Sequence, residues 1–442
     1  MSLFHRHHAL AIGSLASGFA RAVFIVTMFV TTGIATRIFS KEEFGLWAIL
    51  LSFIYLGFAF DFGFRSALTN RLVAMVADSS GRTNNQQRDF FLSIFYLQIV
   101  IGIIGALLFL MFGNAIPWAN LLKVNQPEIA GNINRLMTLV FFILFINVPL
   151  LASSSGFVAF QEVHLDAVLN AIQWIILLGF FWISAFMKLL SFEKVVMWYF
   201  VVYFLIGLAR TLILFHHRKW CLAWVPVVEQ LRNIRAISSV SSHFFLLNIS
   251  ALIVSTGGTF LAGLIGGLAD AGDFNLIQRL FGLLITMHMA IMASFGPAFT
   301  QSARLGNWEG VRRKLHFCLY IIVPILFIGT GGLILVFHPF ILSLWTGLDL
   351  SNYTLAILLA LFALVMGWGN TNSILLNSLG LVKSQAFWAF MVAPIYLFLI
   401  FYFGKLFGVV GVALASVLCV IPGTIFFTYY TRQAIKLKKI NV

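Results

Sequence analysis

Residues 9–36 read ALAIGSLASGFARAVFIVTMFVTTGIAT, and this stretch decides the fold because Arg21 is its only charged residue. Roughly 20 consecutive, mostly apolar residues are enough for an α-helix to cross a bilayer. The stretch follows Arg6 and three histidines, and it is longer than the apolar core of a cleaved signal peptide. It therefore predicts a first transmembrane helix that remains in the protein and contains an arginine.

The composition of the whole chain supports the same fold class. Of the 442 residues, 61% are hydrophobic and only 10% are charged, whereas about 25% of the residues of a soluble domain are charged. We therefore expect an integral membrane protein. The three cysteines are scattered, so their spacing predicts neither a disulfide framework nor a metal site, and we expect no metal and no cofactor.

Polar clusters divide the chain into twelve apolar runs of membrane-spanning length. Such continuous runs are typical of helices and not of outer-membrane barrels, whose strands have about 10 residues of alternating character. The sequence therefore predicts an all-α integral membrane protein. Its transmembrane helices are expected near residues 11–36, 44–64, 90–113, 136–157, 167–187, 195–215, 239–267, 274–298, 315–337, 354–378, 384–403 and 407–430.

The distribution of lysine and arginine predicts the orientation of these helices. With the N-terminus in the cytoplasm, most of the 28 basic residues fall on the cytoplasmic side, as the positive-inside rule requires. An even number of spans then places both termini in the cytoplasm. The net charge of +14 is thus mainly a topology signal. Nucleic acid is not an expected partner, because no loop is large or aromatic enough to bind it.

Two stretches in the two halves of the chain resemble each other. Residues 40–47 read SKEEFGLW and residues 270–277 read DAGDFNLI, and in both an acidic residue precedes Phe-x-Leu. At nearly equal separations they are followed by FGFR at 62–65 and FGPA at 295–298. The alternative is a shared helix-start device, since acids are favoured at helix N-termini and aromatics at membrane interfaces.

The repeat predicts two six-helix halves, residues 1–217 and 239–442, joined by a basic cytoplasmic linker at 218–238. Because each half has an even number of spans, the halves are parallel repeats. Transporters built from such repeats hold their substrate between the halves and rock one half against the other. We therefore expect a central cavity.

Two arginines inside predicted spans are candidate cavity residues. An ionisable group at membrane depth is costly and usually faces a cavity or a partner. Arg21 and Arg279, with Asn248 and Gln278, are therefore predicted to line a cationic cavity in which arginine forks bind phosphate. The alternative is that both arginines extend to the membrane interfaces and bind nothing.

A second group of polar residues is a candidate gate or coupling site. Asp61 ends the second predicted span, and with Arg65 and Arg71 it forms either a cytoplasmic gate or an ordinary charge cluster at a helix end. His243 and His288 are either packing residues or groups that bind protons or substrate. Asp273, near Arg279, belongs to the same group of candidates.

The sequence shows no catalytic constellation. It contains no Walker A loop and no His or Cys pattern with metal-ligand spacing. The predicted outer loops at 268–273 and 338–352 carry only three acidic residues. A membrane glycosyltransferase or polymerase would be expected to expose more acids there, so a transporter is favoured over an enzyme.

Three stretches resemble the bacterial polysaccharide (O-antigen, Wzx-type) flippases of the multidrug/oligosaccharidyl-lipid/polysaccharide exporter superfamily. They are RIFSKEEFGLW at 37–47, DFGFRSALTNR at 61–71 and LWTG at 344–347. The resemblance implies a flippase that moves undecaprenyl-diphosphate-linked oligosaccharides, such as O-antigen repeat units, across the bacterial inner membrane. It also implies a cationic cavity and an ion gradient as the driving force. By this resemblance Arg21 has the role of a cavity cation, and Arg279 is a looser match to the same role.

The resemblance also limits the alternatives. It implies membrane lipids and the lipid-linked oligosaccharide as partners, with the polysaccharide polymerase and the chain-length machinery nearby. A drug or metabolite antiporter of the same superfamily would favour acids at mid-depth, where this chain has arginines. A lipid II flippase would resemble fourteen-span proteins. Trp174, Asn170 and Gln173 are further candidates for contact with sugars.

Overall fold

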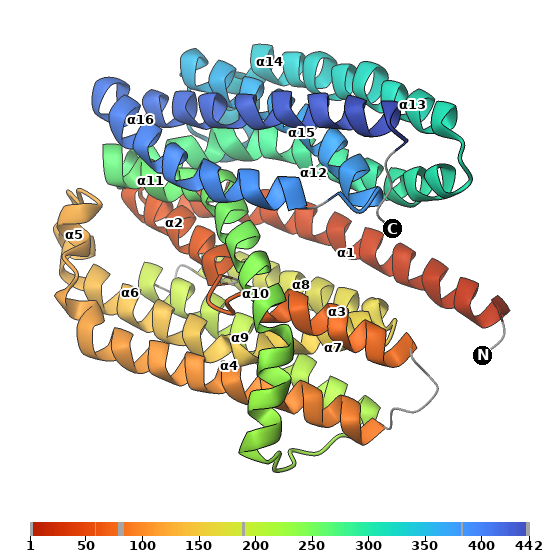
Figure 1. Ribbon diagram of the computed structural model, residues 1–442. Helices are drawn as coiled ribbons and strands as arrows, with labels where there is room; N and C mark the ends of the chain where they lie inside the picture. The colour runs from red at the N-terminus through yellow and green to blue at the C-terminus, as the bar shows by residue number, and fades with distance from the viewer. Residues whose placement is uncertain (1–2, 58, 78–83, 188–190, 382, 439–442) are drawn as a thin grey trace. The chain divides into compact units, whose positions relative to one another are not determined.

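The computed structural model describes residues 3–57, 59–77, 84–187, 191–381 and 383–438. Within these ranges every regular element is a helix, as the sequence predicts. The chain packs as two compact units (Figure 1). Unit 1 contains Met1–Glu43 and Leu50–Ile249, and unit 2 contains Phe44–Ile49 and Ser250–Val442. The predicted halves and linker stay a prediction.

Sixteen α-helices follow one another along the described residues, with short 3₁₀ turns at Gly113–Ala115 and Pro149–Leu151 and π-helical turns at Cys318–Ile322 and Pro324–Thr330. The α-helices are α1 (Leu3–Ile38), α2 (Lys41–Gly57), α3 (Phe64–Ala77), α4 (Asn84–Phe112), α5 (Trp118–Leu121), α6 (Pro127–Asn147), α7 (Ala152–Ala159), α8 (Val163–Met187), α9 (Phe192–Arg218), α10 (Val227–Ser255), α11 (Gly257–Gly266), α12 (Leu268–Arg304), α13 (Trp308–Phe317), α14 (Gly331–Thr346), α15 (Tyr353–Ser378) and α16 (Lys383–Lys436).

The described helices confirm the predicted twelve-span fold. Ten stretches are long and apolar enough to cross a membrane. A further span is broken into α2 and α3, and α16 consists of two helices that meet at Gly408, whose φ of 60° is not helical. With these two additions, the described residues contain twelve spans. The predicted break between the last two spans, at 404–406, lies close to the observed kink at Gly408.

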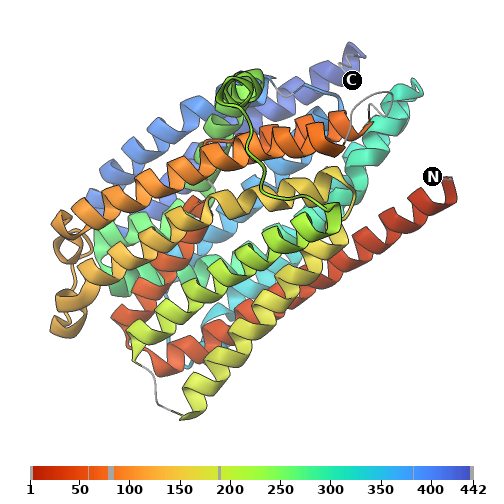
Figure 2. The same ribbon diagram turned by 90° about the horizontal axis from the view of Figure 1, so that it is seen from below.

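Unit 1 is built around two sets of packed helices. The long helix α1 lies along α8, where Ala20 packs against Ala167 and Ala171 (Figure 2). On the other side, α6 lies between α4 and α9 (Figure 1). Small residues at the α1–α8 contact let the two backbones approach closely, which is the usual way for helices to pack in lipid.

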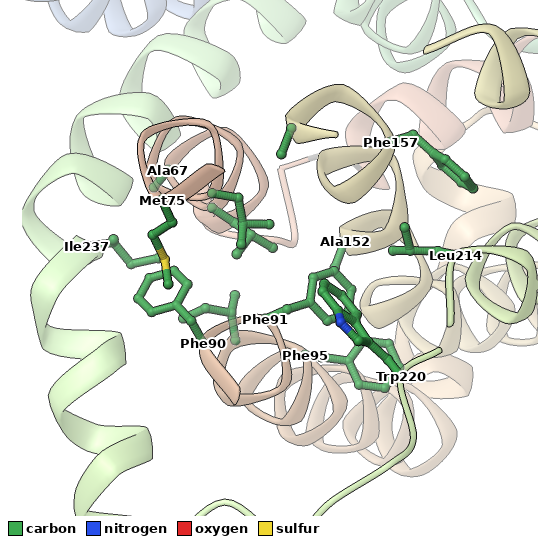
Figure 3. Close-up of a cluster of buried hydrophobic side chains, with 14 residues drawn as sticks. Ala67, Met75, Phe90, Phe91, Phe95, Ala152, Phe157, Leu214, Trp220 and Ile237 are labelled. Carbon is green, nitrogen blue, oxygen red and sulfur yellow. The ribbon is translucent and has the colours of Figure 1, made fainter. Parts of the chain in front are cut away.

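One end of unit 1 has an aromatic core that joins α3, α4, α7, α9 and the segment before α10. In Figure 3, Trp220 lies beside Phe91 and Phe95, and Ile237 of α10 lies near Phe90 and Met75. The ring centroids of Trp220 and Phe91 are 5.3 Å apart. This core fixes the chain between α9 and α10, although the sequence predicts an interruption at 216–238.

Unit 2 is a bundle in which α15 packs against both α12 and α16, and α11 packs against α12 and α16 (Figure 1). Its core lies between α12, α13, α15 and α16. The buried side chains of this core include Met292, Phe299, Leu315, Leu375 and Ala434.

The acidic residues of the SKEEF stretch shape two helix starts. Ser40 and Glu43 form a capping box at α2: Ser40 N donates to Glu43 Oε2 at 2.8 Å, and Glu43 N donates to Ser40 Oγ at 3.2 Å. The buried carboxylate of Glu42 accepts a 3.0 Å hydrogen bond from Gln126 N, at the start of α6. The helix-start interpretation therefore holds for these acids.

The first turns of α2 and α12 meet at glycines. A Cβ added to Gly45 would lie 1.7 Å from the backbone oxygen of Leu268, and one added to Gly272 would lie 3.1 Å from the Phe44 ring. Only glycine allows this approach. The Phe44-Gly45 pair and the DAGDF stretch, which resemble each other in sequence, therefore pack directly together in unit 2.

We expect Gly45→Ala to destabilise the protein by about 1–3 kcal/mol, because the added methyl group overlaps the backbone of α12. The midpoint temperature of unfolding in detergent measures this. Gly282→Ala on α12 is the control, since a Cβ there meets nothing within 4 Å and alanine favours the helix. A Gly45→Ala protein that melts at or above the wild-type temperature would contradict the close contact.

Candidate functional site

Arg279 lies in a hydrogen-bonded network between α11 and α12. Its Nε donates to Asn275 Oδ1 at 2.7 Å, and Asn275 Nδ2 donates to Thr259 Oγ1 at 3.0 Å. Thr259 Oγ1 in turn donates to Gln278 Oε1 at 3.2 Å. At 1.5 Å per residue, Arg279 is about 9 Å along α12 from Asp273, the last residue of the predicted outer loop, and so lies within the predicted span 274–298.

This network orients a permanent positive charge within an apolar helix. Asn275 is buried and holds the guanidinium by its Nε, so the plane of the fork is fixed from one side. Arg279 itself is partly exposed. A planar guanidinium recognises phosphate or carboxylate through two parallel hydrogen bonds.

The four predicted cavity residues are divided between the two units. Gln278 and Arg279 lie together in unit 2, joined through Thr259 and Asn275. Asn248 is half-buried on α10 in unit 1. The side chain of Arg21 lies outside the described residues. Its backbone belongs to α1, one residue after Ala20 at the contact with α8, and near the start of the candidate span Gly18–Ile38.

Asp61 and Arg65 meet at the break between α2 and α3. Asp61 is 1% exposed, its Oδ1 accepts a 2.7 Å hydrogen bond from Gly63 N, and its Oδ2 accepts a 3.2 Å bond from Arg65 N. The Arg65 guanidinium lies 4.0 Å from the same carboxylate. Phe62 and Gly63 have φ values of 50° and 76°, so the Asp61 side chain stabilises a tight turn and the start of α3. Arg71 is exposed on α3.

The two predicted histidines have different surroundings. His243 is exposed, and its Nδ1 donates to the carbonyl oxygen of Ser239 in the same helix at 2.6 Å. His288 is completely buried, with Nε2 2.9 Å from Thr371 Oγ1. Thr371 donates its single proton to Gly367 O, so His288 Nε2 is the donor to Thr371. Asp273 is partly buried in the second turn of α12.

An ion pair in unit 1, between the buried Arg210 and the partly buried Asp166, was not predicted. Arg210 of α9 is 8% exposed, and its Nε lies 2.8 Å from Asp166 Oδ1 at the first turn of α8. Its Nη2 donates to Asn170 Oδ1 at 2.9 Å. Unit 1 thus has two arginine–aspartate pairs, one at the turn between α2 and α3 and one between α8 and α9.

A signal for this cluster is present in the sequence. Arg210 lies inside the predicted run 195–215, and Asp166 directly precedes the neighbouring run 167–187. Opposite charges in adjacent spans are candidates for an interhelical pair. The other proposed sugar contacts are less accessible. Gln173 is buried, and the ring centroids of Trp174 and Phe24 are 4.8 Å apart.

Residues 17–303, from within α1 almost to the end of α12, match the family model described as polysaccharide biosynthesis protein. The chain belongs to the polysaccharide biosynthesis protein family. The match includes Asp61, Asp166, Arg210 and Arg279, so both charge clusters lie in the part of the chain that defines the family. None of the curated protein sequences matches the chain.

Solved structures resemble this polysaccharide biosynthesis family protein over nearly its whole length. A lipid II flippase, MurJ, in an inward closed conformation has a TM-score of 0.69 at 14% identity, covering 97% of this chain and 90% of that one. A MOP superfamily transporter from Pyrococcus furiosus, described as having a binding pocket of reverse polarity, has a TM-score of 0.66 at 13% identity, covering 98% and 96%.

An outward-facing multidrug resistance MATE transporter also matches, with a TM-score of 0.64 at 14% identity over 97% of this chain and 96% of that one. At such identities the likeness concerns the fold alone. The polysaccharide biosynthesis family protein therefore has the twelve-helix fold of the MOP superfamily transporters, as the count of spans predicts.

Proposed function

We propose that the protein is a flippase. It moves undecaprenyl-diphosphate-linked oligosaccharides, such as O-antigen or other surface polysaccharide repeat units, from the cytoplasmic to the outer leaflet of the bacterial inner membrane. Transport proceeds by alternating access and is driven by an ion gradient, with both termini in the cytoplasm. The observation that carries this proposal is Arg279, a permanent cation held by amides and a hydroxyl inside an apolar helix.

The chemistry of the substrate explains why such a cation is needed. A diphosphate with attached sugars is too polar to enter the hydrocarbon layer without compensation. The guanidinium of Arg279 offsets part of this desolvation cost, and Gln278 offers an amide to sugar hydroxyls or phosphate oxygens. Arg21 and Asn248 are proposed as further contacts for the substrate, while the polyprenyl tail stays in lipid.

Several residues are proposed to open the cavity or to couple it to the ion gradient. Asp61 and Arg65, at the turn between α2 and α3, form the proposed cytoplasmic gate with Arg71. His288 is the proposed proton-binding group, since it is buried and bonds from α12 to α15. Asp273 and His243 are weaker candidates for the same roles. The polysaccharide polymerase and the chain-length machinery are the proposed protein partners.

A drug or metabolite antiporter is the second candidate function, because MATE transporters share the fold. An antiporter for cationic drugs requires a negative charge where the substrate binds. The hydrogen bonds described for the network on α11 and α12 join Arg279, a cation, to Asn275, Thr259 and Gln278. The presence of this cation favours an anionic substrate.

The decisive experiment is to deplete the protein in its host and to measure which leaflet holds the lipid-linked oligosaccharide, with a sugar-modifying reagent that cannot cross the membrane. We expect the intermediate to accumulate on the cytoplasmic side. An unchanged distribution, in a host without a second flippase, would favour the antiporter. Correctly flipped but unextended intermediates would indicate a polymerase.

In the same assay we expect Arg21→Ala to abolish rescue, whereas Arg21→Lys rescues in part. Lysine keeps the charge but loses the planar fork that binds phosphate through two hydrogen bonds. Expression is checked by quantifying the protein in the membrane fraction. Full rescue by well-expressed Arg21→Ala would mean that this arginine extends to the interface and does not bind the substrate.

A further inference from the structure

The segment between α9 and α10 is firmly attached to unit 1. Trp220 is buried in the aromatic core shown in Figure 3, and its Nε1 donates to Asn84 Oδ1 at 2.8 Å. Tyr96 Oη of α4 donates to the carbonyl oxygen of Ala223 at 2.9 Å. Asn233 Nδ2 of α10 donates to Ser93 Oγ of α4 at 3.0 Å. The segment therefore has a defined position along α4.

From this fixed segment a group of large apolar side chains projects outward. Trp224 and Val228 are each 81% exposed. We call the group the linker patch; its members are Leu222, Trp224, Val227, Val228 and Leu231. Large apolar side chains exposed together in one short segment indicate a surface that is covered by something other than water.

The linker patch is separate from the membrane-spanning part of α10. The helix begins at Val227, but residues 232–243 include two arginines, four serines and a histidine before the apolar run resumes at Phe244. In Figures 1 and 2, α10 runs across α3 and α4 and not alongside them. The depth of its first turns therefore follows from where they contact α4.

The contacts with α4 show at which depth in the membrane the linker patch lies. Helix α4 is polar from Asn84 to Asp89 and apolar from Phe90 onward. Its partners in the linker, Ala223 and Asn233, lie beside Tyr96 and Ser93, just past that change. The patch thus lies at the boundary between headgroups and acyl chains, where tryptophan is enriched.

The charges around the linker patch are complementary to an anionic surface. Lys219, Arg232 and Arg235 are exposed beside it. Glu229 is the acidic residue of this stretch, and it is 3.2 Å from Arg232. Apolar side chains flanked by basic ones are the pattern of segments that lie in the interface of membranes with anionic lipids.

We propose that residues 221–235 form an interfacial anchor that inserts the linker patch into the leaflet beside α4 and binds anionic phospholipid headgroups through Arg232 and Arg235. The anchor is a lipid-binding site distinct from the network around Arg279. It holds the chain between α9 and α10 at a fixed depth in the membrane. Its existence does not depend on which substrate is transported.

Cys221 gives direct access to this segment, because it is exposed whereas Cys318 and Cys419 are buried. The full-length protein is labelled at Cys221 with an environment-sensitive maleimide and reconstituted into phosphatidylcholine vesicles, with or without one quarter phosphatidylglycerol. Quenching by lipids with a nitroxide high on the acyl chain, and by aqueous iodide, reports the depth of the label. We expect strong nitroxide quenching and weak iodide quenching, and a larger nitroxide effect with phosphatidylglycerol.

Paired variants separate the two parts of the anchor. Trp224→Ser with Val228→Ser is expected to lower nitroxide quenching in both kinds of vesicle. Arg232→Gln with Arg235→Gln is expected to remove only the increase caused by phosphatidylglycerol. Arg312→Gln with Arg313→Gln on α13, two exposed arginines whose neighbours Val311 and Leu315 are buried, is the control and leaves the signal unchanged.

Two results would overturn the proposal. Iodide quenching as strong as for a free label, in both kinds of vesicle, would mean that the segment lies in water and that its patch serves a protein partner. Nitroxide quenching that is the same with and without phosphatidylglycerol would exclude anionic lipid as the ligand. The iodide and nitroxide measurements test the anchor even if the transport assay fails, because neither of them measures transport.

Discussion

Arg279→Ala abolishes flipping while the protein still folds and reaches the membrane; this is the largest effect on transport that we expect. A hydrogen bond to a charged group contributes about 1.5–3 kcal/mol, so losing a two-pronged contact with a phosphate lowers the affinity at least about a hundredfold. The measurement is rescue of the depleted host in the leaflet assay, normalised to the amount of protein in the membrane.

Matched variants show whether Arg279 acts through the two parallel hydrogen bonds that its planar guanidinium can form. Arg279→Lys keeps the charge and is expected to retain partial transport. Asn275→Ala leaves the arginine in place but removes the acceptor that orients its Nε, so a smaller loss is expected. Arg304→Ala, an exposed arginine in the last turn of the same helix, is the control and should transport normally.

Transport by Arg279→Ala at the wild-type level would assign the arginine a structural role in the contact between α11 and α12. Loss of transport in Arg279→Ala together with normal transport in Asn275→Ala would mean that the orientation of the guanidinium does not matter. In that case the charge alone would account for the effect.

The span pattern could be predicted because it depends on local composition. A run such as 354–378 must be helical in lipid, since no water is present to bond with its backbone, and α15 covers almost the same residues. The start of α10 could not be predicted in this way. Val227 to Arg235 forms helix in a stretch expected to interrupt the spans, and contacts with α4 hold it there.

The candidate site was predictable only in part, for a related reason. Arg279 is visible in the sequence because a charge stands alone in an apolar run. Its partners Asn275 and Thr259 are ordinary polar residues, and only the packing of α11 on α12 selects them. Asp166 and Arg210 are distant in sequence, so their pairing depends on how α8 lies against α9.

The second large effect concerns that buried pair. Asp166→Ala leaves the Arg210 guanidinium buried with only Asn170 as a bonded neighbour among the described contacts, and removal of one partner of a buried ion pair costs about 3–5 kcal/mol. We therefore expect Asp166→Ala to lower the unfolding temperature in detergent strongly, and Arg210→Ala to do the same because it leaves the carboxylate of Asp166 without its guanidinium partner.

The double variant Asp166→Leu with Arg210→Met separates stability from function. Replacing both members of a buried pair with apolar residues is often neutral for stability, so the unfolding temperature should return close to that of the wild type. The exposed Glu309–Arg313 pair, 3.3 Å apart, is the control, and its removal should change little. A double variant that melts as low as the single ones would show that the two residues do not act as a pair.

Transport by the same double variant then decides what the pair is for. If Asp166 and Arg210 only hold α8 against α9, a stable double variant should flip the substrate normally. Because Arg210 is an ionisable residue inside the predicted span 195–215, where such residues usually serve function, we expect the opposite, a stable protein with little transport. That result would mean that unit 1 contributes a cation to the transport cycle, as proposed for Arg279 in unit 2, and that Asp166 restrains this cation by pairing with it.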